Sequence, residues 1–337
     1  MFSPTKQGGM PEWTQLWRSL MKGQFHSVKL VKILHQVGLP VIGMLVFVMI
    51  WHLGAQRIDT SLGVFPGPLE VAEQGQNLYA EHVAERGKEA GFYQRQEVRV
   101  AERVLVDPGY KPVLRDYTGS ATFFDQILTS LATVMSGFLL ASLIAVPLGI
   151  VIGLSSSMHA AINPLIQILK PVSPLAWLPL VTMLVSAIYT SDDPMVAKSF
   201  VTSMLTVSLC SLWPTLINTS VGVTSVSQDL VNVSRVLRLG WWSHVIKIVL
   251  PSALPMIFTG LRLSLGIAWM VLIAAEMLAQ NPGLGKFVWD EFQNGSSQSL
   301  GRIMVAAFAI GFIGFLLDRA MLSLQRWLVW DKQSAQR

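Results

Sequence analysis

Long apolar runs alternate with short polar segments along most of this chain, and six runs have the length needed to cross a bilayer. A membrane-spanning helix needs roughly 20 predominantly apolar residues. The runs lie near residues 37–55, 127–154, 165–189, 197–219, 254–278 and 303–323. Between Asp125 and Lys170 no side chain is Asp, Glu, Lys or Arg, so that interval holds one crossing and a turn. The pattern predicts an all-α polytopic membrane protein with six transmembrane helices.

The same pattern divides the chain into five segments. We predict an N-terminal segment over 1–36, a first transmembrane helix over 37–55, an insert over 56–126, a transmembrane domain over 127–324 and a tail over 325–337. The first run is longer than the apolar part of a cleavable signal and more than thirty residues precede it, so we expect it to stay as an anchor.

The insert is the only soluble-looking part. It is rich in helix formers, and we expect it to be mainly helical, with one or two amphipathic helices broken around Gly87 and Gly91. It is either a docking surface for an extracytoplasmic partner or a solvated decoration.

Composition agrees with a membrane protein. Only 13% of the residues are charged, against roughly 25% in soluble domains, and the mean hydropathy is +0.49. The single cysteine, Cys210, excludes a disulfide framework and a thiolate metal site. Although the isoelectric point is near 9.4, the basic residues lie at the ends of apolar runs. There they orient a membrane protein, so we expect no nucleic-acid partner.

Charge also predicts the orientation in the membrane. Five basic residues precede the first crossing, against one acidic residue, Glu12; they are Lys6, Arg18, Lys22, Lys29 and Lys32. We therefore expect the N-terminus in the cytoplasm of a bacterial cell, with the protein in the inner membrane. Alternation places the loop with Arg235, Arg238 and Lys247, and the C-terminal tail, on the same side. Residues 57–125 hold eleven acidic and eight basic residues, a net charge of −3, and lie outside.

Catalytic chemistry is absent from the sequence pattern. Phe287 stands where the Ser or Thr of a phosphate-binding loop would bind Mg²⁺, and the histidines form no metal-ligand pattern. We predict no catalytic residue and no metal site, so the chain is not itself an enzyme.

Few ionisable groups interrupt the crossings. Lys170 can reach the cytoplasmic interface. Arg262 can bond helix carbonyls, pair, reach the interface or present a cation to an anionic substrate. We expect Glu276 to be a hydrogen-bonding group at a helix end or gate rather than a proton carrier. The candidate substrate path comprises Arg262, Glu276, Ser173 and Trp177.

A basic stretch between two crossings, "NVSRVLRLGWWSHVIKIVLPSALP", covers Asn232 to Pro255. Read as one helix, its apolar side chains recur at spacings of three and four and form a stripe of Leu230, Val233, Leu237 and Trp241. Gly240 allows a bend, and Pro251 and Pro255 frame the start of the next crossing. The stripe fills a groove on a cytoplasmic partner or rests on lipid headgroups, and the pattern alone leaves both open.

This stretch resembles the cytoplasmic coupling loop of type I ABC importer permeases, which carries E-A-A, then Gly, then I-x-L-P. Asn232, Val233 and Ser234 occupy the E-A-A positions, Arg238 and Gly240 the glycine region, and Ile248, Leu250 and Pro251 the end. The first Glu and the first Gly are missing, as in the branch that imports nitrate, bicarbonate, taurine and other sulfonates. Segments such as "LKPVSPLAWLPL" and "GLGKFVWD" extend the resemblance over most of Ser130 to Arg326, and it is closest to nitrate-type permeases.

The resemblance implies a type I ABC transmembrane domain over 127–324, with the coupling loop near 222–252 and Arg235 within it. It implies a second permease copy as a homodimer, two cytoplasmic ATPase subunits that bind ATP and Mg²⁺, and an extracytoplasmic binding protein. This chain then binds no cofactor and carries a small anion, nitrate or nitrite, by alternating access.

Other substrates and classes stay open. The alternative anions are taurine or an alkanesulfonate, bicarbonate and cyanate. A stand-alone secondary carrier would be favoured by an inverted repeat or paired buried carboxylates, neither of which the sequence shows. A membrane anchor or scaffold would leave the coupling-loop pattern unexplained.

Overall fold

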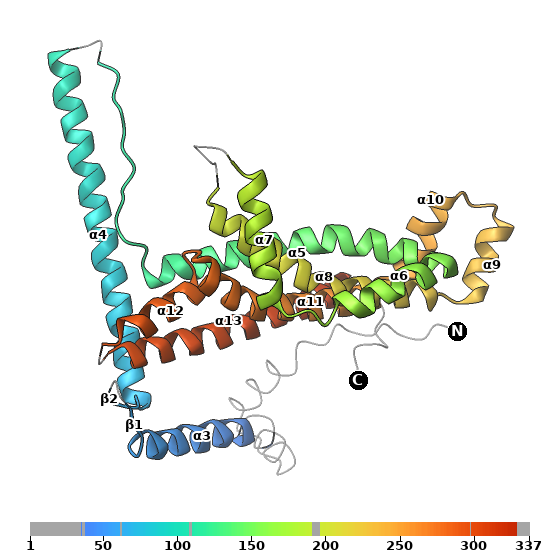
Figure 1. Cartoon of the computed structure of the whole chain (residues 1–337), viewed down its shortest axis with the longest axis horizontal. Coiled ribbons are helices and arrows are strands. Elements are labelled where there is room, and N and C mark those ends of the chain that lie inside the picture. The colour runs from blue at the N-terminus through green and yellow to red at the C-terminus, as the bar shows by residue number, and fades with distance from the viewer. Residues whose placement is uncertain are drawn as a thin grey trace, which may run out of the picture. The chain divides into compact units, whose positions relative to one another are not determined.

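The computed structural model describes residues 35, 38–60, 63–107, 110–190, 196–296 and 298–328 (Figure 1). The contacts between residues divide the chain into two compact units, Met1–Leu69 and Glu70–Arg337. The predicted N-terminal segment and the tail lie almost wholly outside the described residues. The five predicted segment boundaries stay predictions.

The first unit holds one apolar helix and a small hairpin. Helix α3, Leu39–Ala55, is exposed along nearly all its length and is shorter than a typical span. Strands β1, Asp59–Thr60, and β2, Gly63–Val64, pair antiparallel, with Asp59 opposite Val64. Trp51 Nε1 donates a hydrogen bond to the carbonyl of Pro66, 3.2 Å away, which fixes the C-terminal end of α3 to the chain beyond the hairpin. Among the described residues, β1 and β2 are the only strands.

The insert forms a single long helix, α4, Pro68–Val106. The predicted break around Gly87 and Gly91 is therefore wrong. Each glycine costs about 1 kcal/mol relative to Ala within a helix, but strong helix formers surround both. The segment that returns from the tip also bonds to α4 on both sides of them: Tyr117 Oη donates to Glu85, and the amide of Arg115 donates to Oε1 of Gln96.

Four helical segments are long and apolar enough to cross a membrane. They are α5, Phe123–Leu154; α8, Lys198–Thr224; the run Trp241–Ala279, which includes α11, Leu250–Ala279; and α13, Ser299–Leu328. Two shorter helices, α9, Gln228–Val236, and α12, Leu284–Asn294, lie between them in the chain. The helical membrane fold is confirmed, whereas the number of six crossings stays a prediction.

The predicted crossing over 165–189 is wrong as one continuous helix. The structure has α6, Ser156–Leu169, and α7, Pro174–Ile188, bent by 100° at the break between them. Pro171 and Pro174 lack the backbone N–H that a continuous helix needs, and Ser173 caps the new helix by accepting a hydrogen bond from the amide of Leu175 at 3.3 Å. Hydropathy does not detect this interruption because proline and serine hardly lower the mean of an apolar window.

Helices α5, α8 and α11 form the core, and small residues bring their backbones close. A Cβ at Gly137 or Gly149 of α5 would lie 2.8 or 2.9 Å from a carbonyl oxygen of α8. On the other side of α8, a Cβ at Gly260 of α11 would lie 2.9 Å from the Cα of Thr215. Packing through small residues and hydroxyls replaces the hydrophobic driving force that membrane helices lack among themselves.

The two ends of this bundle differ. Helix α12 and the N-terminal part of α4 lie at one end, and α9 with the short helix α10, Trp241–His244, lies at the other (Figure 1). Helix α4 runs across the end of the bundle rather than along it. Its N-terminal part is held there by the buried Leu78, by an ion pair of Glu81 with Arg302, and by the contact of His82 with Thr122.

Candidate coupling site and polar clusters in the membrane

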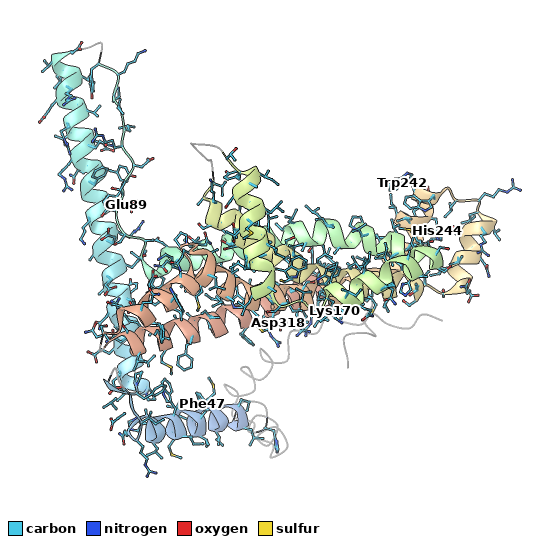
Figure 2. All side chains as sticks on the ribbon, in the orientation of Figure 1. Phe47, Glu89, Lys170, Trp242, His244 and Asp318 are labelled. Carbon is cyan, nitrogen blue, oxygen red and sulfur yellow. The ribbon has the colours of Figure 1, made fainter. Side chains whose placement is uncertain are left out.

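The coupling segment occupies the end of the bundle opposite α12, where Trp242 and His244 are labelled (Figure 2). It consists of α9, a turn, α10 and one π-helical turn, Val245–Val249, that leads into α11. Ser234 is buried, and its hydroxyl lies 2.8 Å from Nδ1 of His244. This hydrogen bond ties α9 to α10 across the turn.

The predicted single helix from Leu230 to Trp241 is wrong. Helix α9 ends at Val236, and Arg238 adopts a left-handed backbone conformation with φ of 47°. The amide of Leu239 then donates to the carbonyl of Ser234 at 3.1 Å, which satisfies an open carbonyl at the helix end. The bend thus lies at Arg238, while Gly240, where it was predicted, is extended.

The predicted apolar side chains are nevertheless all exposed. Leu230, Val233, Leu237 and Trp241 are 41, 49, 63 and 52% exposed. Of the other predicted coupling residues, Asn232, Arg235, Arg238, Gly240 and Pro251 are exposed, and Ile248 and Leu250 are half-buried. The described residues therefore leave an apolar surface on α9 and α10 without a covering partner.

A cavity of about 1080 Å³ separates the coupling segment from the ends of α5, α6 and α8. Arg235, Arg238, His159 and His244 line it, and no acidic side chain does. Because this space lies between them, the coupling segment is joined to the bundle mainly through the chain of α8 and α11. Packing against α6 does not hold it in place.

A second polar site surrounds Glu276, at the other end of α11. Its side chain is fully buried, and its carboxylate accepts hydrogen bonds from Ser130 Oγ at 2.8 and 2.9 Å and from the amide of Gly285 at 3.0 Å. The amide of Leu284 donates to the same Ser130 hydroxyl at 2.8 Å. Glu276 and Ser130 together cap the N-terminus of α12, whose first amides have no partner within the helix.

Neighbouring residues complete this cluster. Asn281 Nδ2 donates to Thr133 Oγ1 at 3.2 Å, and Ser199 Oγ lies 3.5 Å from Asn281 Oδ1. A Cβ at Gly283 would lie 2.2 Å from a Glu276 oxygen, so only glycine fits beside the carboxylate. The cluster joins α5, α8, α11 and α12, which agrees with the predicted hydrogen-bonding role of Glu276.

Arg262 is paired, which is one of the roles that the sequence left open. Its Nε and Nη2 donate to the two carboxylate oxygens of Asp318 on α13, at 2.5 and 3.1 Å. Trp269 and Gly314 border a cavity of about 230 Å³ beside the pair. Asp318 was missed, although an acidic residue within the last apolar run was a signal that pointed to it.

The remaining two path residues lie on α7. Ser173 is its exposed N-cap, and Trp177 is half-buried in its first turn. Within the part of the chain that the structure describes, no hydrogen bond or ion pair joins either of them to Arg262 or Glu276. In the same described ranges, no three His, Cys, Asp or Glu side chains are grouped so that they could hold a metal ion.

Apolar helices packed through small residues, with a segment that projects from one end, are typical of a polytopic membrane transport component. The chain belongs to the family described as "Binding-protein-dependent transport system inner membrane component", whose sequence pattern matches residues 145–330. The predicted permease class is therefore confirmed.

Named relatives agree with this family. The chain is 33% identical to the bicarbonate transport system permease protein CmpB of Synechococcus elongatus, over 96% of both chains. It is 35% identical to the nitrate import permease protein NrtB of Leptolyngbya laminosa, over 73% of this chain and 82% of that one. It is 32% identical to the taurine transport system permease protein TauC of Escherichia coli, over 62% of this chain and 70% of that one.

A solved structure supports the fold. An inward-facing structure of the MetNI methionine ABC transporter aligns with a TM-score of 0.53 at 12% identity, over 61% of this chain and 95% of that chain. At this identity the likeness concerns the fold alone.

Proposed function

We propose that this chain is the permease subunit of an ATP-driven importer that carries nitrate or nitrite across the inner membrane by alternating access. The observation that carries the coupling role is the exposed apolar surface of α9 and α10, which projects from the end of the bundle. The likeness to nitrate import permeases, at 35 to 38% identity for three relatives, supports the choice of substrate.

Two copies of the chain form the pore. A single chain leaves large apolar side chains uncovered on α7, where Met183 and Ile188 are 72 and 73% exposed, and on α11, where Met270 is 75% exposed. A second copy would cover part of these faces and line a path with the rest. Ser173, Trp177, Arg262 and Glu276 are the path residues that we propose. At Arg262 an anion has to compete with the carboxylate of Asp318.

Two cytoplasmic ATPase subunits each receive one coupling segment. They bind ATP and Mg²⁺, and this chain binds neither. A binding protein delivers the anion outside, at the end of the bundle that carries α4 and α12. In this orientation both termini are cytoplasmic and α4 is extracytoplasmic, which agrees with the basic residues near the coupling segment and the net negative insert.

Bicarbonate is the second candidate substrate, because the bicarbonate permease CmpB matches over 96% of this chain. Reconstituted vesicles separate the two. Permease, ATPase subunits and binding protein are assembled in proteoliposomes, and uptake of labelled nitrate and of labelled bicarbonate is measured with and without ATP.

We expect ATP-dependent nitrate accumulation that excess bicarbonate does not inhibit. Accumulation of bicarbonate without nitrate would reassign the substrate. Uptake that proceeds equally without ATP would contradict the importer itself.

A further inference from the structure

One face of α4 is exposed and is formed by uncharged residues over many turns, with the exposed Glu97 at its edge. Every third or fourth residue in the middle of the helix is uncharged and exposed, and we call this set the outer stripe: Val83, Gly87, Ala90, Gln94, Val98 and Ala101. The same register continues to Ala72 in one direction and to Leu105 in the other. The rest of the exposed surface of α4 is rich in charged residues, so the stripe is a distinct face.

The outer stripe points away from the membrane helices. At about 100° per residue, its centre lies roughly 150° around α4 from the buried Leu78. Glu81, His82, Glu85 and Gln96, which contact the rest of the second unit, lie on the Leu78 side of α4. Tyr79 and Arg86, which contact Phe124 and Asp125 of α5, lie on the flank between that side and the stripe. The chain that returns from the tip also runs along the bundle side of α4 (Figure 1).

The direction in which the outer stripe faces determines which partner can bind to it. Lipid lies beside the bundle, and so does a second permease copy related by a two-fold axis along the bundle. The stripe faces neither. It faces outward beyond the end of the bundle that is opposite the coupling segment. A family that depends on a binding protein needs a surface there on which that soluble protein docks.

We propose that the outer stripe of α4 is a docking surface for the extracytoplasmic binding protein. The inference rests on the proposed function, which places α4 outside and makes uptake dependent on that protein. Small residues such as Ala90 and Gly87 let a partner backbone approach closely, and Val83 and Val98 provide apolar side chains between them. Depletion of charge at the centre of a patch is typical of protein interfaces.

The dimensions fit a transient contact. From Ala72 to Leu105 the stripe is about 50 Å long, and with a width of about 10 Å it offers about 500 Å². Stable complexes bury about 800 Å² on each partner. A smaller surface suits a binding protein that has to leave after each delivery, with the bundle itself supplying further contacts.

Two alanines of α4 provide a matched test. Ala90 lies in the stripe, and Ala84 is exposed about a quarter turn away, on the flank that carries Lys88. Both are changed to Glu in the complete permease–ATPase complex in lipid nanodiscs, and the Kd of its purified binding protein is measured. Because both substitutions cost the helix the same propensity, stability does not separate them.

We expect Ala90→Glu to weaken binding at least about 10-fold, because a carboxylate would be left unpaired at the contact, and Ala84→Glu to change the Kd by less than about 2-fold. ATP hydrolysis without the binding protein stays at the wild-type rate in both. Equal affinities of the two variants would overturn the docking surface. Absence of any binding to the wild-type complex would instead contradict the proposed function.

A photo-crosslinking residue in place of Val98 identifies the neighbour directly. A covalent adduct with the purified binding protein, lost when Ala90→Glu is added, is the expected result. An adduct of two permease copies, an adduct with lipid alone, or no adduct would each overturn the proposal.

Discussion

The two ends of α11 are built in opposite ways, although one helix connects them. Near α12, Glu276 is fully buried and its carboxylate is bonded to two neighbouring elements. At the other end, a π-helical turn leads back to a segment in which Leu237 is 63% exposed and a cavity separates it from α6. One end is therefore anchored by hydrogen bonds in a dry environment, and the other is free to follow a partner.

This difference indicates how motion passes through the chain. Under the proposed function, a displacement of the coupling segment would act on a helix whose far end is held by α5 and α12, so we expect α11 to tilt about that end instead of sliding. The anchored end also sets the position of α12, which faces the binding protein in the proposed orientation. Four sets of substitutions test the contrast.

The largest effect is expected at the anchored end. Glu276→Ala removes the acceptor for Ser130 Oγ and the Gly285 amide and leaves both donors buried. We expect a loss of about 3 to 5 kcal/mol in the free energy of unfolding. The thermal midpoint of the purified permease measures it.

Glu276→Gln keeps one acceptor oxygen and should lose less, and the exposed Glu73→Ala serves as the control. If the Glu276→Ala and Glu73→Ala variants have the same thermal midpoint, the hydrogen bonds of Glu276 do not stabilise this end of α11.

At the free end, Leu237→Asp should leave folding intact and abolish coupling. Leu237 is 63% exposed, so the substitution should disturb little packing, but a carboxylate in the proposed, desolvated ATPase groove costs several kcal/mol. We expect normal amounts of permease in the membrane, loss of the co-purified ATPase subunit and no uptake.

Leu237→Met is the matched apolar control. Undiminished recovery of the ATPase with Leu237→Asp would show that the segment rests on lipid, and degradation of the variant would show that it packs inside the permease.

Between these ends, the Arg262–Asp318 pair should contribute about 1 to 2 kcal/mol, because both side chains are partly exposed at 40 and 34%. A double-mutant cycle with Arg262→Ala and Asp318→Ala measures this coupling as the change in thermal stability. Removing both partners avoids leaving one charge alone, so the double variant should be more stable than Arg262→Ala.

Uptake by the double variant then separates two roles of Arg262. Restored uptake would make the arginine a pairing residue only. Uptake that stays low in a stable double variant, and returns in part with Arg262→Lys, would support contact with the anion.

The smallest effect is expected in α4, outside both ends of α11. A hydrogen bond from Tyr117, 2.7 Å long, and then one from Lys88 lower the pKa of Glu85 below its ordinary value of 4.5. A carboxyl group with a lowered pKa in the folded state stabilises it above the ordinary pKa and loses this contribution as the pH falls through the lowered value.

The returning segment should therefore stay on α4 at pH 7 and loosen only below about pH 4.5. Protease sensitivity of residues 110–122 against pH measures this, and Tyr117→Phe should remove the pH dependence at that contact. A profile unchanged by Tyr117→Phe would show that other bonds hold the segment.

Hydrophobic patterning determined the helical membrane fold, because bilayer thickness imposes a length that the apolar runs reveal directly. The stretch around Asn232 to Pro251 also identified the family, since its residue types are visible without a structure. Helix interruptions were harder to predict. The break near Ser173 and the continuity of α4 through Gly87 and Gly91 depend on capping and on contacts from distant residues.

The polar contacts were decided only by tertiary structure. Glu276 meets Ser130 across 146 positions of sequence, and Arg262 meets Asp318 across 56. Periodicity reports which face of a helix a residue occupies, but a hydrogen bond also needs the depth and rotation of the neighbouring helix. Those quantities follow from close contacts such as Gly137 and Gly260 against α8, which arise only when the helices pack.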